Sequence, residues 1–253
     1  MLSIICRFNH KYEVFLKDLF DYVITRYGNG LELSKLKSIE MVKSLSNESD
    51  GRMIDEKSIQ ISSRLYKHLP TLDVSDLHYN DTFKIIVKTF YHELCHISEI
   101  SVMPQIHQYG FSQEGINFMV ALFWIEYIVE RKSYAIINLY DNKLCTDVAK
   151  NRWNISKLNY DEADCSNYFY LTKVLPYVIA RIQVDGSANT YIKTIKNPIV
   201  QSMVYELNNE VLRIEVFYPF DGIENLRGIH ELFEKYFDFF MERKDFVNVF
   251  PRN

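Results

Sequence analysis

The residues best suited to chemistry stand together at positions 92–96, which read His-Glu-Leu-Cys-His. On a helix, His92 and His96 lie one turn apart on the same face, so both imidazoles can bind one metal ion. Glu93 points to one side of the pair, where its carboxylate can take a proton from a metal-bound water and later deliver it to a leaving group. This HExxH spacing predicts a Zn²⁺ ion on His92 and His96, with Glu93 as the general base.

A catalytic zinc ion needs a third protein ligand and an open fourth position. Glu126 interrupts a mostly apolar stretch, residues 116–129, where a carboxylate is costly to bury unless a cation satisfies it. Glu130, one turn later on the same side, is a rival third ligand, or it accepts the second ring N–H of a zinc-bound histidine. In the simpler alternative, both glutamates mark a solvent-facing side of the helix and pair with Arg131 or Lys132.

Other residues near the motif receive different roles. The pattern HExxHxxGxxH is excluded, because Glu99 and Val102 stand where it needs Gly and His. Glu99 is expected about 4.5 Å beyond His96 along the helix, beside the site or in solvent. His107 remains a possible ligand, and Cys95 is expected to face the core. Four residues are equal candidates to stabilise an oxyanion: His107, Tyr109, Tyr134 and His230.

Two predicted helices position the candidate ligands. The first spans about 82–99, capped by Asn80 or Asp81, with an apolar face that includes Phe83, Phe90 and Leu94. The second spans about 115–140 and carries both glutamates. A loop at 101–115, with Pro104 and two glycines, is expected between them.

The rest of the chain predicts an α+β fold, predominantly helical, with a small sheet. Residues 1–145 are expected to form the core with the metal site, and residues 146–253 a helical C-terminal region packed on it. Further helices are predicted at 9–27, 31–45, 64–68, 159–184 and 224–245, and strands at 57–62 and 211–218.

HExxH on one helix, followed about thirty residues later by a glutamate on the next, resembles the gluzincin branch of the zincin metallopeptidases. Within it the chain looks closest to the ImmA/IrrE group, over roughly residues 57–135. In that register Glu126 matches the ligand and Ser133 a small residue two turns on, while Val129 and Glu130 replace the usual alanine and asparagine. The resemblance implies a zincin-like core and a peptide or protein substrate, in this group often a DNA-binding repressor. It also implies that the exposed edge of strand 57–62 receives the peptide.

The composition indicates which binding partners and which cellular compartment to expect. The net charge of −4, with scattered basic residues, argues against direct nucleic-acid binding. The four cysteines are scattered, as in reduced intracellular proteins. The longest apolar run, residues 118–125, is far shorter than a membrane span. A cytoplasmic protein is expected.

The leading hypothesis is therefore a zinc-dependent metallopeptidase, a hydrolase. One alternative is a catalytically inactive or structural-zinc domain that acts as a protein-interaction module. Another is a helical interaction protein in which the HExxH spacing is accidental.

Overall fold

The computed structural model describes residues 2–45, 50–112, 115–138, 154–157 and 165–241. The chain divides into two compact units. Unit 1 comprises residues 1–104 and 128–146, and unit 2 comprises residues 105–127 and 147–253. Helix α4 (Gly115–Asn138) is continuous and contributes to both units. One division, after residue 146, lies beside the predicted boundary after residue 145, and residues 105–127 group with the C-terminal region.

Unit 1 is built on a four-stranded mixed sheet in the order β1-β2-β4-β3. The strands are β1 (Ser3–Ile5), β2 (Ser38–Val42), β3 (Gly51–Asp55) and β4 (Ser58–Ser62). β1, β2 and β4 run parallel, and β3 pairs antiparallel with β4. The strand predicted at 57–62 is thus confirmed as β4, but it is an inner strand. The expectation that its edge is exposed is wrong, because β3 covers that edge.

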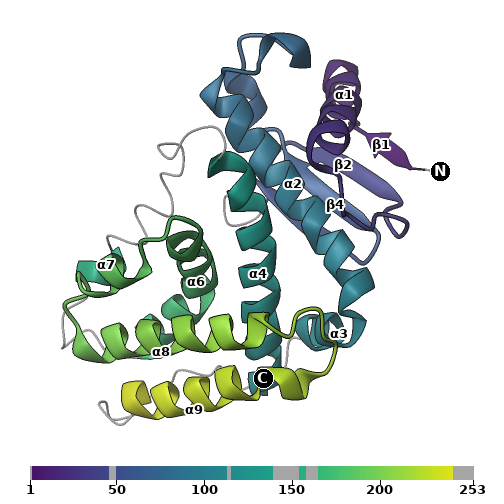
Figure 1. Cartoon of the computed structure of the whole chain (residues 1–253). Helices are drawn as coiled ribbons and strands as arrows, with labels where there is room; N and C mark the ends of the chain where they lie inside the picture. Colours follow the sequence, from purple (N-terminus) through teal and green to yellow (C-terminus); the bar gives the residue numbers. More distant parts are fainter. Residues whose placement is uncertain (1, 46–49, 113–114, 139–153, 158–164, 242–253) are drawn as a thin grey trace. The chain divides into compact units, whose positions relative to one another are not determined.

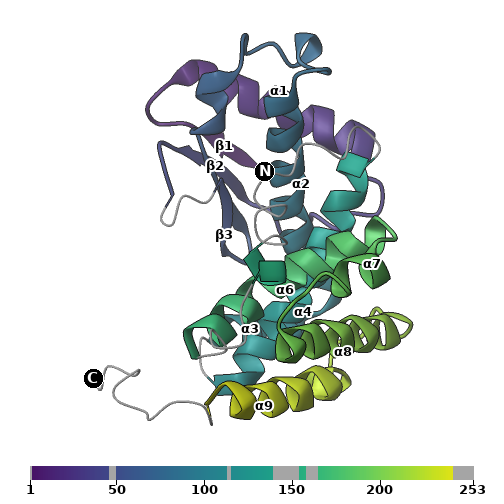
Figure 2. The ribbon, with the colours of Figure 1, turned by 90° about the vertical axis from the view of Figure 1, so that its left-hand side faces the viewer.

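The two faces of this sheet differ in polarity, as alternating strand residues require. Ile39 and Ile59 point to the buried face. Helices α1 (His10–Tyr27) and α2 (Asp81–Val102) cover it, α1 against β1 and β2 and α2 against β3 and β4 (Figure 1). Figure 2 shows both helices on the same side of the strands. The opposite face is polar, with Gln60 hydrogen-bonded to Glu40 and Arg52.

Helix α2 forms where the sequence predicts it. The Asn80 side chain accepts a hydrogen bond from the Phe83 backbone N–H at 3.0 Å, which caps the first turn. Its apolar face, with Phe83, Phe90 and Leu94, is buried in the core. The HExxH segment therefore lies in the middle of a packed helix, where its backbone is held by regular hydrogen bonds on both sides.

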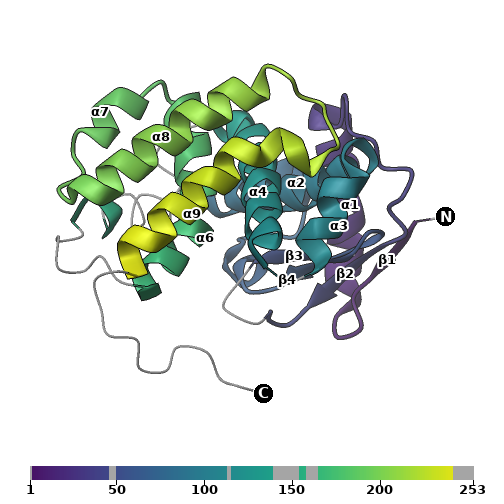
Figure 3. The same ribbon diagram turned by 90° about the horizontal axis from the view of Figure 1, so that it is seen from below.

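The regular secondary structure described in unit 2 is helical. Besides the first part of α4, it contains α3 (Pro104–Ser112), α6 (Cys165–Val184), α7 (Ala188–Ile192), α8 (Pro198–Glu215) and α9 (Arg227–Met241). The short 3₁₀ helix η6 (Ile223–Leu226) leads into α9, and α8 and α9 run side by side (Figure 3). Two further 3₁₀ helices, η2 (Leu65–His68) and η3 (Val74–Asp76), belong to unit 1.

Three predicted elements are wrong. Residues 31–45 contain strand β2 and no helix, because Ile39 and Met41 alternate into the core between two parallel neighbours. The loop expected at 101–115 contains α3, whose first turn is capped by Asp221, which accepts from the Gln105 N–H at 2.7 Å. The strand expected at 211–218 overlaps the last turns of α8.

Helix α8 is capped by Asn197, whose side chain accepts from two backbone N–H groups, and it begins with Pro198 directly after the cap. Its buried residues Val204, Leu207, Val211 and Ile214 repeat with helical spacing. The fold class is nevertheless as predicted: α+β, mostly helical, with a small sheet. Within the described residues, no helix is both long and apolar enough to span a membrane.

Candidate metal centre

The two histidines of the motif face one another on α2. His92 and His96 are 7% and 6% exposed, and their Nε2 atoms lie 3.1 Å apart. Each of these residues offers a ligand atom that lies within 4.8 Å of the others and of a carboxylate oxygen of Glu126. Among the described residues, these three form the group that can hold a metal ion.

The donor set fits zinc. With Zn–N distances of about 2.0–2.1 Å and tetrahedral angles, two imidazole nitrogens on one ion lie roughly 3.3 Å apart. The observed separation of 3.1 Å is close to that value. Two histidines and one carboxylate are also a ligand set of catalytic zinc sites, which leave the fourth position for water.

Glu126 is half-buried on α4 and is held by a second contact. The hydroxyl of Tyr177 donates a hydrogen bond of 2.6 Å to Glu126 Oε2. Tyr177 lies on α6, 51 residues away in the sequence, and no local sequence pattern predicts its role. The bond fixes one carboxylate oxygen of Glu126.

Glu130 and Ser133 meet the other nitrogen of His92. Glu130 Oε2 is 3.1 Å, and Ser133 Oγ 3.2 Å, from His92 Nδ1. The Ser133 hydroxyl donates to the backbone carbonyl of Glu130, so its lone pairs face the ring. Both neighbours of Nδ1 are then acceptors, which places the proton of a neutral His92 on Nδ1 and the lone pair on Nε2. That lone pair points to the side where His96 lies.

Two ion pairs join α2 to α4 on either side of the histidines. Lys88 Nζ lies 2.6 Å from Glu130 Oε2, and Lys132 pairs with Glu99. Both carboxylates are fully buried, so each needs its cation to offset the cost of desolvation. Glu99 is therefore not in solvent. Lys88 was missed by the sequence analysis, although it lies one helical turn before His92 and so on the same face.

Glu93 lies against the edge strand β3. A Cβ atom built on Gly51 would come within 2.8 Å of Glu93 Cγ and Oε1, so this position has room only for glycine unless Glu93 moves. Glu93 is 6% exposed. The buried carboxylate and the first residue of β3 are in direct contact, which links the motif to the sheet edge.

The remaining candidates lie elsewhere in the described chain. His107 is buried on α3 and is not part of the group that can hold a metal. Tyr109 is on α3, Tyr134 on α4 and His230 on α9. Cys95 is fully buried, as its helix position predicts, and burial raises the pKa of its thiol.

The sequence was compared with protein-family models and with curated proteins, and the structure with solved structures. No family model, no curated protein and no solved structure matches this chain.

Proposed function

We propose that this protein is a zinc-dependent metallopeptidase with His92, His96 and Glu126 as metal ligands and Glu93 as the general base. The observation that carries the proposal is the group of two buried imidazoles and one carboxylate, with ligand atoms within 4.8 Å of one another. On the strength of its motif we assign the chain to the gluzincin-like zincins, closest to the ImmA/IrrE group. We place it in the cytoplasm, acting on a protein or peptide and not on nucleic acid.

The chain's own residues have distinct tasks in this mechanism. Glu130 and Ser133 hold the proton of His92 on Nδ1, so that Nε2 faces the metal position. Tyr177 fixes one oxygen of Glu126. Glu93 takes a proton from the attacking water and returns it to the leaving amine. A bound Zn²⁺ would lower the pKa of that water and polarise the scissile carbonyl.

The surroundings of Glu93 support a peptide as the substrate. In the described sheet β3 pairs on one side with β4, and its other edge has no strand beside it. An extended peptide can add to such an edge through backbone hydrogen bonds. Because Gly51 of β3 touches Glu93, a peptide on this edge would pass close to the general base. We therefore propose that the peptide binds to the edge of β3, and not to the edge of β4 as the sequence predicted.

The test compares metal content and cleavage in matched variants. We expect one zinc per chain in the parent protein, loss of zinc in His92→Ala and His96→Ala, and weaker zinc binding in Glu126→Gln. Glu93→Gln should keep its zinc and lose cleavage of unfolded protein substrates by at least about a hundredfold, as expected for a lost general base. Glu13→Gln, at a partly exposed position of α1, is the control and should behave like the parent.

Three results would contradict the proposal. If the parent protein is purified in the presence of zinc and contains no metal, the proposed zinc site is wrong. If Glu93→Gln keeps the activity of the parent, the proposed role of Glu93 as the general base is wrong. A zinc ion with four protein ligands would favour the structural-zinc alternative, because a catalytic site keeps one position for water.

A further inference from the structure

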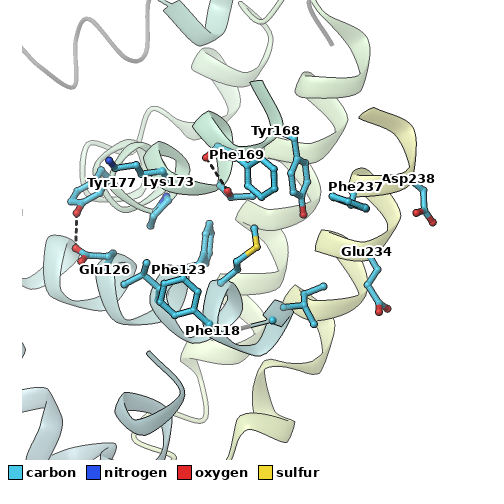
Figure 4. Close-up of a pocket in the computed structure, with 16 residues that line it drawn as sticks. Phe118, Phe123, Glu126, Tyr168, Phe169, Lys173, Tyr177, Glu234, Phe237 and Asp238 are labelled. Carbon is cyan, nitrogen blue, oxygen red and sulfur yellow. Dashed lines mark hydrogen bonds between the residues drawn. The ribbon is translucent and has the colours of Figure 1, made fainter. Parts of the chain in front are cut away.

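Unit 2 contains a cavity of about 870 Å³ between helices α4, α6 and α9 (Figure 4). This volume is within the range of small-molecule sites, about 300–1,000 Å³. All the residues that line it belong to unit 2. Its walls are mainly apolar, with Phe118 and Leu122 from α4, Phe169 from α6 and Phe237 from α9.

The apolar wall is not closed off from water. Leu122 and Phe169 are each 37% exposed, which is unfavourable for large apolar side chains gathered in one place. Contiguous apolar surface of this kind marks a binding site more often than isolated exposed residues do. The cavity therefore has the surface to hold an apolar chain.

Polar groups stand at the two ends of the cavity. At one end are Glu126, Tyr177 and Lys173, and the Tyr177 hydroxyl is already bonded to Glu126 (Figure 4). At the other end, the carboxylates of Glu234 and Asp238 point away from the cluster of rings. Neither acidic residue at this second end is directed at a ligand lying between the rings.

Among the described residues that line the cavity, Lys173 is the one cation. It is exposed, and it forms no hydrogen bond or ion pair with any described residue. Glu126 has its own partner in Tyr177. The group left to meet a ligand at this end is thus a primary ammonium, which pairs best with an anion.

We propose that this cavity binds an amphiphile with one long apolar chain and a single anionic head group. The chain lies between Leu122, Phe169 and Phe237, and the head group pairs with Lys173. A cationic head group would meet the Lys173 charge, and a neutral one would leave it without a partner. Free fatty acids and anionic single-chain lipids share this chemistry. The site does not depend on the proposed peptidase activity.

The test is calorimetric titration of the full-length protein with probes of one chain length: dodecanoate, dodecanol and dodecyltrimethylammonium. Dodecanoate should bind about tenfold more tightly than either of the others, as expected for one charge-assisted bond. Dodecanoyl lysophosphatidylglycerol distinguishes the sources. Tighter binding than dodecanoate assigns the site to lipids, and weaker binding assigns it to free fatty acids.

Variants locate the binding. Lys173→Gln should weaken dodecanoate binding about tenfold and leave dodecanol binding unchanged. Leu122→Glu, at a partly exposed wall position, should weaken both. Lys193→Gln, an exposed lysine outside this cavity, should change neither. Circular dichroism checks that each variant is folded. If Lys173→Gln has the same zinc content as the parent, its weaker dodecanoate binding is not caused by a change at the proposed metal site.

The proposal is overturned if no probe binds, if dodecyltrimethylammonium binds as tightly as dodecanoate, or if Lys173→Gln leaves dodecanoate binding unchanged. The first outcome would show that the cavity does not bind a single-chain amphiphile. The second and third would show that Lys173 does not select the head group.

Discussion

Lys88 is expected to stabilise unit 1 strongly, although it stands outside the HExxH motif. Its Nζ lies 2.6 Å from Glu130 Oε2, and the two side chains are 14% and 0% exposed. Removing one partner of a buried pair costs about 3–5 kcal/mol, because the other charge stays buried. Glu130 keeps its contact with His92, so we expect Lys88→Met to cost somewhat less, about 2–3 kcal/mol.

The measurement is thermal unfolding of the metal-free protein, followed by circular dichroism. For a chain of this length, each kcal/mol lowers Tm by about 2–4 °C, so Lys88→Met should melt about 5–10 °C below the parent. Lys37→Met, at an exposed lysine of unit 1, is the control and should melt within about 1 °C of it. The double variant Lys88→Met/Glu130→Leu should regain at least half of the loss, because it removes the stranded charge.

The same change also tests the link to the metal. Glu130 reaches His92 Nδ1 from the carboxylate oxygen that Lys88 holds. Loss of a partner that orients a metal-bound histidine typically lowers metal affinity about 10–100-fold. Lys88→Met should therefore weaken zinc binding at least about tenfold in competition with a chelator. A Tm equal to that of the parent would refute the buried-pair reasoning, and unchanged zinc affinity would refute the positioning of His92 through Glu130.

Three further changes have defined outcomes. Gly51→Ala places a methyl group against Glu93 and should lower peptide cleavage at least about tenfold with zinc content unchanged, since a small displacement of a catalytic group is costly; parental activity would contradict this. Asn80→Ala removes the cap of α2 and should lower the free energy of unfolding by about 1 kcal/mol, measured in urea. Partial burial raises the pKa of Glu206, but hydrogen bonds from Lys235, Tyr236 and Ser202 outweigh it and the pKa is lowered. Because the folded pKa is below the unfolded one, this stability is present above the unfolded pKa, about 4.3, and is lost as the pH falls through the folded pKa. Glu206→Gln should thus lower the free energy of unfolding by about 1 kcal/mol or less at pH 7, because the ion pair is partly exposed, and by progressively less as the pH is lowered, measured by urea unfolding at several pH values.

Local signals predicted α2 well because they act within one element. A short stretch of sequence contains both the cap at Asn80 and the apolar residues of the buried face, and the structure has both features. Strand β2 could not be found this way, since its state depends on two parallel partners far along the chain. Likewise, the cap of α3 is Asp221, more than a hundred residues away. Contacts of this kind leave no pattern near the residues that they stabilise.

The residues of the candidate site also differ in whether a local sequence pattern could have predicted them. Lys88 could have been found, because it precedes His92 by one turn of the same helix. Tyr177 could not, because its contact with Glu126 depends on how α6 packs against α4. The glycine at position 51 gave no signal either, since its role comes from the closeness of β3 to Glu93.

Glu126 and Glu130 were rivals for one role because the sequence places them one turn apart on the same side of a helix. An imidazole, however, has two nitrogens on different sides of its ring, and a metal-bound histidine needs a partner at each. Glu130 lies 3.1 Å from His92 Nδ1, while Glu126 belongs to the group that can hold a metal with His92 and His96. The α4 helix is continuous through both residues, and one turn of it rises about 5.4 Å. That rise is comparable to the span from an acceptor at Nδ1 across the ring to a metal at Nε2. The two glutamates are therefore better understood as candidates for two different roles, Glu130 as the acceptor at His92 Nδ1 and Glu126 as the proposed third ligand, than as rivals for one ligand position.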